Sequence, residues 1–329
     1  MGTQAESTAL QARRGGDAMP LLARLAPLGA LVLLFLVMAL FVPGFFSINN
    51  LTNVTRQVSI NAIIASGMTL VIITAGIDLS VGSLVALAGC VAMIALNRTD
   101  SDVIGVLAGI AIGGLAGAFN GGLVAYARLP AFVVTLGGLT IFRGIALTIT
   151  EGQPIIRFEG AYKWLGQGFM LGVPVPVWIM IVVVLATHIV LKRTTLGAHF
   201  FAVGGNETAA RLSGVRVERV KFWAYTLCGL LTGLAGMVLM ARLSSAQPAS
   251  GEMFELDAIA AVVLGGTSLS GGRGTVWGTL VGALIIGILN NSLNLLGVPS
   301  FYQLVAKGVI ILLAVFVDQW LRQRLASRT

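Results

Sequence analysis

The sequence predicts an all-α membrane protein, a polytopic helical bundle with about ten transmembrane helices. Hydrophobic residues make up 57% of the 329 residues, charged residues only 10%, and the mean hydropathy is +0.93. In a soluble domain about a quarter of the residues are charged. Because hydrocarbon offers the backbone no hydrogen-bond partners, each crossing needs about 20 mainly apolar residues in a helix. The chain has many such stretches and no segment with the composition of a separate soluble domain.

Ten apolar stretches lie between polar breaks. They cover residues 21–43, 52–75, 79–96, 103–126, 131–150, 175–191, 222–241, 256–267, 275–295 and 303–321. The eighth is too short to cross about 30 Å of hydrocarbon at about 1.5 Å per residue, so some spans are expected to be broken or re-entrant. The chain then divides into an N-terminal tail over 1–20, a single transmembrane domain over 21–321 and a C-terminal tail over 322–329.

The basic residues predict the orientation, because Lys and Arg accumulate in cytoplasmic loops. With both termini cytoplasmic, the inner segments, 192–221 among them, hold fourteen of the twenty-one Lys and Arg. The outer loops hold four, beside seven acids that include Asp257. The opposite orientation reverses this bias. The net charge of +8 therefore reflects membrane topology, and no nucleic-acid partner is expected.

Two stripes of glycine predict close helix packing. Five glycines recur every four residues in the fourth stretch, and three do so near the start of the ninth. They are Gly105, Gly109, Gly113, Gly117 and Gly121, and Gly274, Gly278 and Gly282. Small residues on one helix face let two backbones approach within the membrane. We interpret both stripes as packing surfaces without substrate contact.

A short motif occurs twice and suggests a weak internal repeat. Residues 76–82 and 266–272 both read G-x-x-L-S-x-G, and each copy separates two apolar stretches. The motif positions considered are Gly76, Asp78, Gly82, Gly266 and Gly272. Transporters are often built from related halves whose helices are interrupted beside the transport pathway. Two helix caps, or chance in a glycine-rich chain, would give the same pattern.

The sequence contains no recognisable catalytic or metal site. His188 and His199 have no carboxylate at a metal-ligand spacing, and Cys90 and Cys228 lie apart in apolar segments. Residues 266–273 lack the Gly-Lys-Ser/Thr ending of a phosphate-binding loop. The chain is therefore not expected to be an enzyme, to hydrolyse ATP or to hold a cofactor.

One predicted cytoplasmic segment has the features of a docking element. It comprises Gly204, Gly205, Asn206, Glu207, Thr208, Ala209, Ala210, Arg211, Leu212, Ser213 and Gly214. Asn206 is a suitable N-cap, Glu207 complements the helix dipole, and Gly214 suits a left-handed end. The resulting two-turn helix is too short to be stable alone, so it must pack against a partner or lie on the membrane surface.

The chain resembles the ribose-type permeases of bacterial ABC importers over nearly its whole length. The segments that carry the resemblance include NAIIASGMTLVIITAGIDLSVGSLVAL at 61–87 and VGGNETAARLSGVRV at 203–217, with 241–287 and 290–298. Permeases for xylose, galactose and arabinose share the first motif. The resemblance implies a permease subunit of the bacterial inner membrane that moves a monosaccharide, ribose first among the candidates, into the cytoplasm by alternating access.

The same resemblance implies several partners. They are a separate ATPase subunit that uses ATP and Mg, a periplasmic sugar-binding protein, and a second copy of the permease in a homodimer, all operating in membrane lipid. It also implies that residues 204–214 form the coupling helix that enters a cleft of the ATPase.

Neutral polar residues are the candidates for lining the sugar pathway, because sugar hydroxyls pair with neutral donors and acceptors. They are Asn61, Ser80, Ser83, Thr267, Ser268, Asn290, Asn291 and Asn294. Each is also a candidate for hydrogen bonding between helices. Among the charged residues, Arg56 and Lys307 are placed near outer span ends, where they would snorkel. Arg143 and Asp78 are placed deeper, as members of an ion pair or a cap.

The main alternative is a secondary sugar transporter driven by an ion gradient. Such a carrier generally needs carboxylates within the membrane to relay the ion. Asp78 is the only acid that the sequence places at that depth, which weighs against this alternative.

Overall fold

A computed structural model describes residues 27–299, 301–309, 312–313 and 316, so both predicted tails lie outside the described residues. Within this part of the chain, seven helices are long and apolar enough to cross a membrane. They are α2 (Ile48–Ile73), α3 (Val81–Thr99), α4 (Asp102–Ala125), α5 (Ala131–Thr150), α7 (Val175–Arg193), α10 (Val217–Leu243) and α12 (Val276–Leu295). The prediction of a polytopic helical membrane protein is confirmed, and each of the seven overlaps a predicted span.

Three shorter helical segments correspond to the remaining predicted spans. An apolar helix covers Pro27–Phe41, α11 covers Phe254–Leu264, and residues 301–309 are helical. The 11 residues of α11 extend about 16 Å at about 1.5 Å per residue, which is half of a bilayer core. The shortness expected from the sequence is therefore present in the structure.

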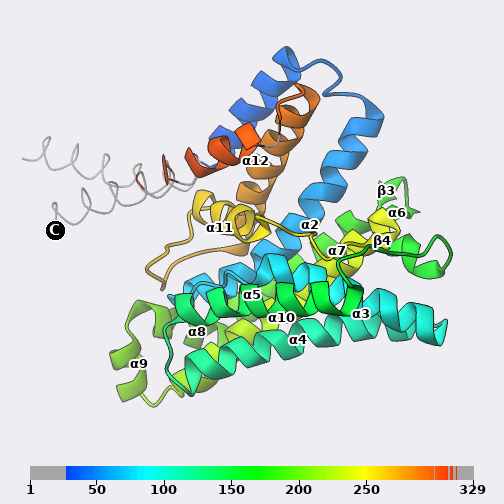
Figure 1. Ribbon diagram of the computed structural model, residues 1–329. Helices are drawn as coiled ribbons and strands as arrows, with labels where there is room; N and C mark the ends of the chain where they lie inside the picture. The colour runs from blue at the N-terminus through cyan, green and yellow to red at the C-terminus, as the bar shows by residue number, and fades with distance from the viewer. Residues whose placement is uncertain (1–26, 300, 310–311, 314–315, 317–329) are drawn as a thin grey trace, which may run out of the picture.

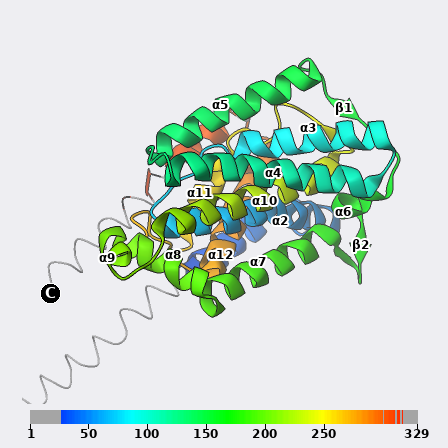
Figure 2. The same ribbon diagram turned by 90° about the horizontal axis from the view of Figure 1, so that it is seen from below.

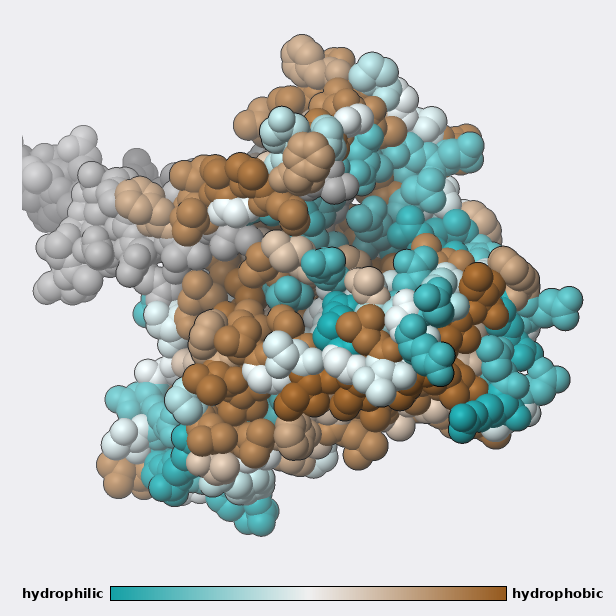
Figure 3. Space-filling model, viewed as in Figure 1, coloured by the Kyte–Doolittle hydropathy of each residue, from teal (hydrophilic) through white to brown (hydrophobic). Residues whose placement is uncertain are grey.

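The long helices lie side by side in one bundle. Both views show α3, α4, α5 and α10 running in similar directions, whereas Figure 1 shows α2 steeply inclined to them and α12 on the other side of α11 from α5. Apolar side chains cover the faces of α4 and α5 in Figure 3, while hydrophilic side chains gather at the α9 end and at the opposite end. This distribution is typical of a bundle whose two ends face water.

The two glycine stripes pack as predicted. A Cβ atom added at Gly113 would lie 2.5 Å from the carbonyl oxygen of Gly229, and one at Gly117 would lie 2.9 Å from the Cα of Gly229, so α4 and α10 meet backbone to backbone. A Cβ at Gly282 of α12 would overlap the carbonyl oxygen of Ala261 in α11. Helices in lipid gain their association from such close contacts.

Short strands that the sequence did not predict lie at the end opposite α9. β1 (Ile155–Ile156) pairs antiparallel with β4 (Ser245–Ala246), and β2 (Phe169–Met170) with β3 (Val173–Pro174). Between them lie the 3-10 helix η1 (Ala161–Lys163) and the one-turn helix α6 (Trp164–Gln167). Apart from these short strands, the regular secondary structure of the described residues is helical, in keeping with the all-α prediction.

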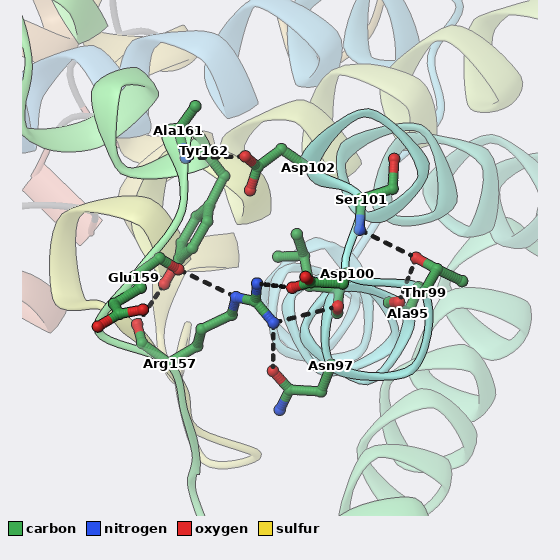
Figure 4. A network of polar contacts seen from close by, with 11 residues as sticks. Ala95, Asn97, Thr99, Asp100, Ser101, Asp102, Arg157, Glu159, Ala161 and Tyr162 are labelled. Atoms are coloured by element: carbon green, nitrogen blue, oxygen red, sulfur yellow. Dashed lines mark hydrogen bonds and ion pairs between the residues drawn. The ribbon is translucent and has the colours of Figure 1, made fainter.

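A polar network fixes this end to α3 and α4 (Figure 4). Arg157 forms an ion pair with Asp100 and donates to the carbonyl oxygen of Leu96 at 3.3 Å. Asp102, in the first turn of α4, accepts a 2.8 Å hydrogen bond from the backbone nitrogen of Ala161. The loop after α5 is thereby held over the turn between α3 and α4.

Candidate functional site

The predicted docking element is a helix, α9 (Glu207–Leu212), that follows a second short helix, α8 (Thr195–Gly205). The Asn206 side chain accepts a 2.9 Å hydrogen bond from the nitrogen of Ala209, and Gly214 has a φ of 84°. The predicted N-cap and left-handed end are therefore confirmed. The helical structure of α8 was missed, because its glycines and single histidine give no clear helical signal.

The two faces of α9 differ. Ala210 is buried against the core, while Thr208 and Ala209 are exposed and Leu212 is 85% exposed. The Leu212 side chain buries little of its apolar surface within its own chain. A partner that covered it would remove that surface from water, so Leu212 is available for docking. The exposed surface formed by Thr208, Ala209 and Leu212 is called the outer face of α9 below.

The charged residues of α9 bind to α10. Glu207 accepts from Lys221 at 2.6 Å, and Arg211 pairs with Glu218 at 2.5 Å and with Glu207 at 3.4 Å. The hydrogen bond from Lys221 holds the pKa of Glu207 below its usual value. These pairs attach α9 to its own chain, while the Glu207 and Arg211 side chains each remain 46% exposed.

A cavity of about 320 Å³ lies behind these ion pairs. Its walls include Thr74 to Gly76, after α2, and Arg128, at the turn between α4 and α5. Arg128 lies 3.9 Å from Glu218, which links this turn to the same charge network. The α9 segment is thus connected to the cavity and to two inter-helix turns.

The second copy of the repeated motif meets the end of α2, just before the first copy, beside α8. The nitrogen of Gly272 donates a 2.9 Å hydrogen bond to the carbonyl oxygen of Ile73, at the end of α2. A Cβ added at Gly204 would overlap that same oxygen, and one at Gly271 would lie 2.8 Å from the carbonyl oxygen of Gly204. We call this meeting point of Ile73, Gly204, Gly271 and Gly272 the glycine junction.

The two motif copies also share one turn. The Asp78 carboxylate accepts from the nitrogen of Ser80 at 2.9 Å, and the Ser268 hydroxyl accepts from the nitrogen of Ser270 at 3.2 Å. The copies then diverge, because α3 begins at Val81 whereas α12 begins only at Val276. Asp78 is fully buried and caps this turn, which agrees with the structural role considered for it.

The predicted pathway residues do not line one cavity. Seven of the eight are buried, and Asn294 is exposed. Ser80 accepts from Asn120 of α4 at 2.9 Å, and Ser83 donates to the carbonyl oxygen of Ser80. Thr267 and Ser268 lie in the loop between α11 and α12, while Asn61 lies in the middle of α2.

The three asparagines of α12 all bond to other segments. Asn291 and Asn50 exchange two side-chain hydrogen bonds of 2.8 and 3.1 Å, which join α12 to α2. Asn294 accepts from Gln303 at 2.9 Å, and Asn290 donates to Asp257 at 3.2 Å. These contacts hold helices together.

Comparisons with known proteins identify the family. Residues 50–315 match the family described as branched-chain amino acid transport system / permease component. The chain is 52% identical over 293 residues to the ribose import permease protein RbsC of Escherichia coli K12, covering 88% of this chain and 91% of the relative. The chain belongs to this family of permeases. RbsC of Bacillus subtilis is 47% identical (90% and 92% covered), and the arabinose permease AraH of Azospirillum brasilense 38% (95% and 92%). No solved structure gives a significant match.

Membership of this family also bears on catalysis. Its members are the permease components of ABC importers, and they are not catalytic themselves. The permease is accordingly not an enzyme, as the sequence predicted.

One predicted position in the permease is wrong. Asp257, placed by the sequence among the acids of the outer loops, lies in α11 and is 4% exposed. It forms a 3.0 Å ion pair with Lys307, so Lys307 does not snorkel to the membrane surface. Asp78 is therefore not the only buried acid. The scarcity of acids within the membrane no longer weighs against an ion-driven carrier. Family membership decides the question instead.

Arg143 of the permease binds backbone. Its guanidinium donates to the carbonyl oxygens of Pro248 and Ser250, the latter at 2.9 Å. Both carbonyls belong to the non-helical segment between β4 and α11. No sequence pattern indicates this contact, because carbonyl acceptors carry no side-chain signature.

Proposed function

We propose that the permease is the membrane-spanning subunit of an ABC importer that moves a monosaccharide, ribose, from the periplasm into the cytoplasm. The identity of 52% to the ribose import permease of Escherichia coli, across 88% of the chain, carries this proposal. The xylose permease XylH of Escherichia coli is 35% identical, and the arabinose permease 38%. The substrates in these three names are all pentoses. They therefore favour a sugar as the substrate, although the description of the whole family names branched-chain amino acids.

The proposed energy source is a separate ATPase subunit that uses ATP and Mg. In this mechanism the segment 204–214 is the coupling helix, and the outer face of α9 enters the ATPase. The exposure of Leu212 supports this role, as does the attachment of Glu207 and Arg211 to α10, which leaves the outer face available. The glycine junction would pass the movement of α8 to α2 and to the α11–α12 loop.

The proposed topology has ten spans and both termini in the cytoplasm, with the inner membrane of a bacterium as its location. The domain limits are those predicted above, 21–321 with two short tails. The α9 end then faces the ATPase, and β1 to β3, η1 and α6 face the periplasmic sugar-binding protein. The fourteen-to-four distribution of basic residues supports this orientation. A second copy of the permease would complete the transporter as a homodimer.

The eight neutral residues named above remain predictions for the pathway. The contacts of Ser80, Asn290 and Asn291 support helix pairing equally well. A pathway role would require these bonds to exchange partners as the transporter alternates between its two states.

The decisive experiment is sugar uptake by the reconstituted complex of permease, ATPase and binding protein in proteoliposomes. Labelled ribose should accumulate only with ATP and Mg, and dissipating the ion gradients with ionophores should leave uptake unchanged. Excess unlabelled ribose should compete more strongly than xylose or arabinose. Uptake that needs an ion gradient and no ATPase would refute the proposal.

A further inference from the structure

The segment between α10 and α11 runs back into the bundle instead of staying at its end. After β4 pairs with β1, it follows α3: a Cβ added at Gly89 would lie 3.8 Å from the Cβ of Ala246, and one at Gly251 would overlap the carbonyl oxygen of Gly82. Gly89 and Gly82 are seven residues apart, about 10 Å along a helix at about 1.5 Å per residue. Residues 245–251 therefore descend along α3 with non-helical backbone.

Arg143 fixes the depth of this segment. It lies twelve residues after Ala131 and seven before Thr150, so it is about 18 Å from one end of α5 and about 10 Å from the other. Its bonds to the carbonyl oxygens of Pro248 and Ser250 place these residues at the same depth. Carbonyls that lack helical partners are thus satisfied by a half-buried cation.

Non-helical backbone at this depth occurs only where it is buried in protein or lines a water-filled cavity. Both situations occur along this segment. Pro248 and Gly251 are buried, whereas Gln247 and Glu252 are exposed and Ser250 is half-buried. Figure 3 shows hydrophilic surface between α5 and α11, in the middle of the apolar band. A glutamate and a glutamine at hydrocarbon depth do not face lipid, so this surface faces water.

We infer that Gln247 and Glu252 line the sugar pathway and bind hydroxyl groups of the passing monosaccharide, and that Arg143 is the positioning residue for the segment that carries them. This inference rests on the proposed function. A glutamine amide both donates and accepts, and a carboxylate accepts strong hydrogen bonds from hydroxyls, which suits a neutral polyhydroxyl ligand. Unlike the buried asparagines of α12, these side chains are exposed.

The first test is water access. Gln247→Cys and Glu252→Cys are made in a background with Cys90→Ala and Cys228→Ala, together with Leu115→Cys, whose parent side chain is 66% exposed on α4, as the lipid-facing control. A small charged thiosulfonate reagent should label the first two and not the third. Ribose-loaded binding protein with ATP should slow both reactions. If both positions resist the reagent as Leu115→Cys does, or if sugar leaves their labelling unchanged, the inference is wrong.

The second test is transport. Glu252→Gln and Gln247→Leu should each lower ribose uptake by about tenfold, because each variant loses about one hydrogen bond to the passing sugar. The amount of permease and the basal ATPase activity should stay normal. Gln153→Leu, at an exposed position in the turn after α5, is the matched control and should transport normally. Normal uptake by both pathway variants would overturn the inference. The proposed function fails only if the unsubstituted complex transports no sugar.

The role of Arg143 has its own readout. Arg143→Gln should reduce uptake and should also change the rate at which Gln247→Cys is labelled, because the segment loses its anchor. Arg143→Lys should restore part of both. An unchanged labelling rate in Arg143→Gln would show that the arginine does not position the segment.

Discussion

The amide nitrogen of Gly272 binds the carbonyl oxygen of Ile73 at 2.9 Å, and the Cα of Gly204 fits against that same oxygen with no room for a side chain. The end of α2, the end of α8 and the loop before α12 therefore meet through backbone alone. This contact joins the coupling segment to the second copy of the repeated motif and to the end of α2, just before the first copy.

Gly204→Ala should damage this junction. Its methyl group would overlap the oxygen of Ile73, and backbone on all sides leaves little freedom to relax, so a loss of about 1–3 kcal/mol in stability is expected. Thermal unfolding of the purified complex and ATPase stimulation by sugar-loaded binding protein would measure the effect. Gly205→Ala is the control, because a Cβ there meets no atom within 4 Å. Equal behaviour of the two variants would contradict this account.

The contact between α4 and α10 gives a second prediction. Gly113→Leu or Gly117→Leu would force the two backbones apart and should reduce both the yield and the melting temperature of the permease. Gly122→Leu, on the same helix but with no atom within 4 Å of its Cβ, should be tolerated. The amount of intact permease in detergent, measured by size-exclusion chromatography, compares the three variants. A normal yield of Gly113→Leu would contradict the close contact between α4 and α10.

The two faces of α9 predict two different defects. Ala209→Arg and Leu212→Glu alter the outer face, so the permease should fold normally but lose its ATPase on purification and lose sugar uptake. Ala210→Arg should instead disrupt the packing of α9 on its own chain, because Ala210 is 5% exposed. Copurification of the ATPase, together with limited proteolysis near residue 207, separates the two outcomes. Undiminished uptake by Leu212→Glu would exclude the outer face as the docking surface.

The buried ion pair between Asp257 and Lys307 predicts a non-additive pair of substitutions. Asp257→Asn or Lys307→Met alone leaves one uncompensated charge and should cost about 3–5 kcal/mol, whereas the double variant should recover part of this loss. Melting temperatures of the four proteins form the cycle. Additive effects would mean that the two charges do not interact.

The proposed topology predicts which residues an impermeant thiol reagent reaches. In a background without Cys90 and Cys228, Leu171→Cys in the turn between β2 and β3 should react in intact spheroplasts, since Leu171 is 87% exposed. Thr208→Cys on α9 should react only after the membrane is opened. The reverse pattern would invert the orientation and with it the assignment of α9 to the ATPase.

Much of the helical fold was predictable, because a long apolar run in lipid must form a helix to satisfy its backbone hydrogen bonds. The predicted span 131–150 and α5 coincide, and the stripe from Gly105 to Gly121 correctly predicted a close helix contact. The local form of α9 also followed from its capping residues, because capping depends on neighbours in sequence.

The candidate pathway was less predictable, for a physical reason. The segment 245–251 has neither helical periodicity nor a long apolar run, so from sequence it cannot be told from a surface loop. Its depth depends on Arg143, whose partners are backbone carbonyls more than 100 residues away. Asp257 was misplaced in the same way, because its partner Lys307 lies 50 residues further along the chain.

In the proposed mechanism, the glycine junction transmits the movement of α8, and the surface that meets the sugar lies elsewhere. Its hydrogen bond and the approach of Gly204 to Ile73 involve backbone atoms alone, and none of its residues belongs to the surface that we propose meets the sugar. The two proposals together predict that substitutions at Gln247 or Glu252 change which pentose is accepted and leave the passage of movement from α8 to α2 unaltered. Evolution of a new cargo in this family would require no redesign of the mechanical linkage, and engineered exchange of the 247–252 segment between sugar permeases should yield hybrids that remain coupled to their original ATPase.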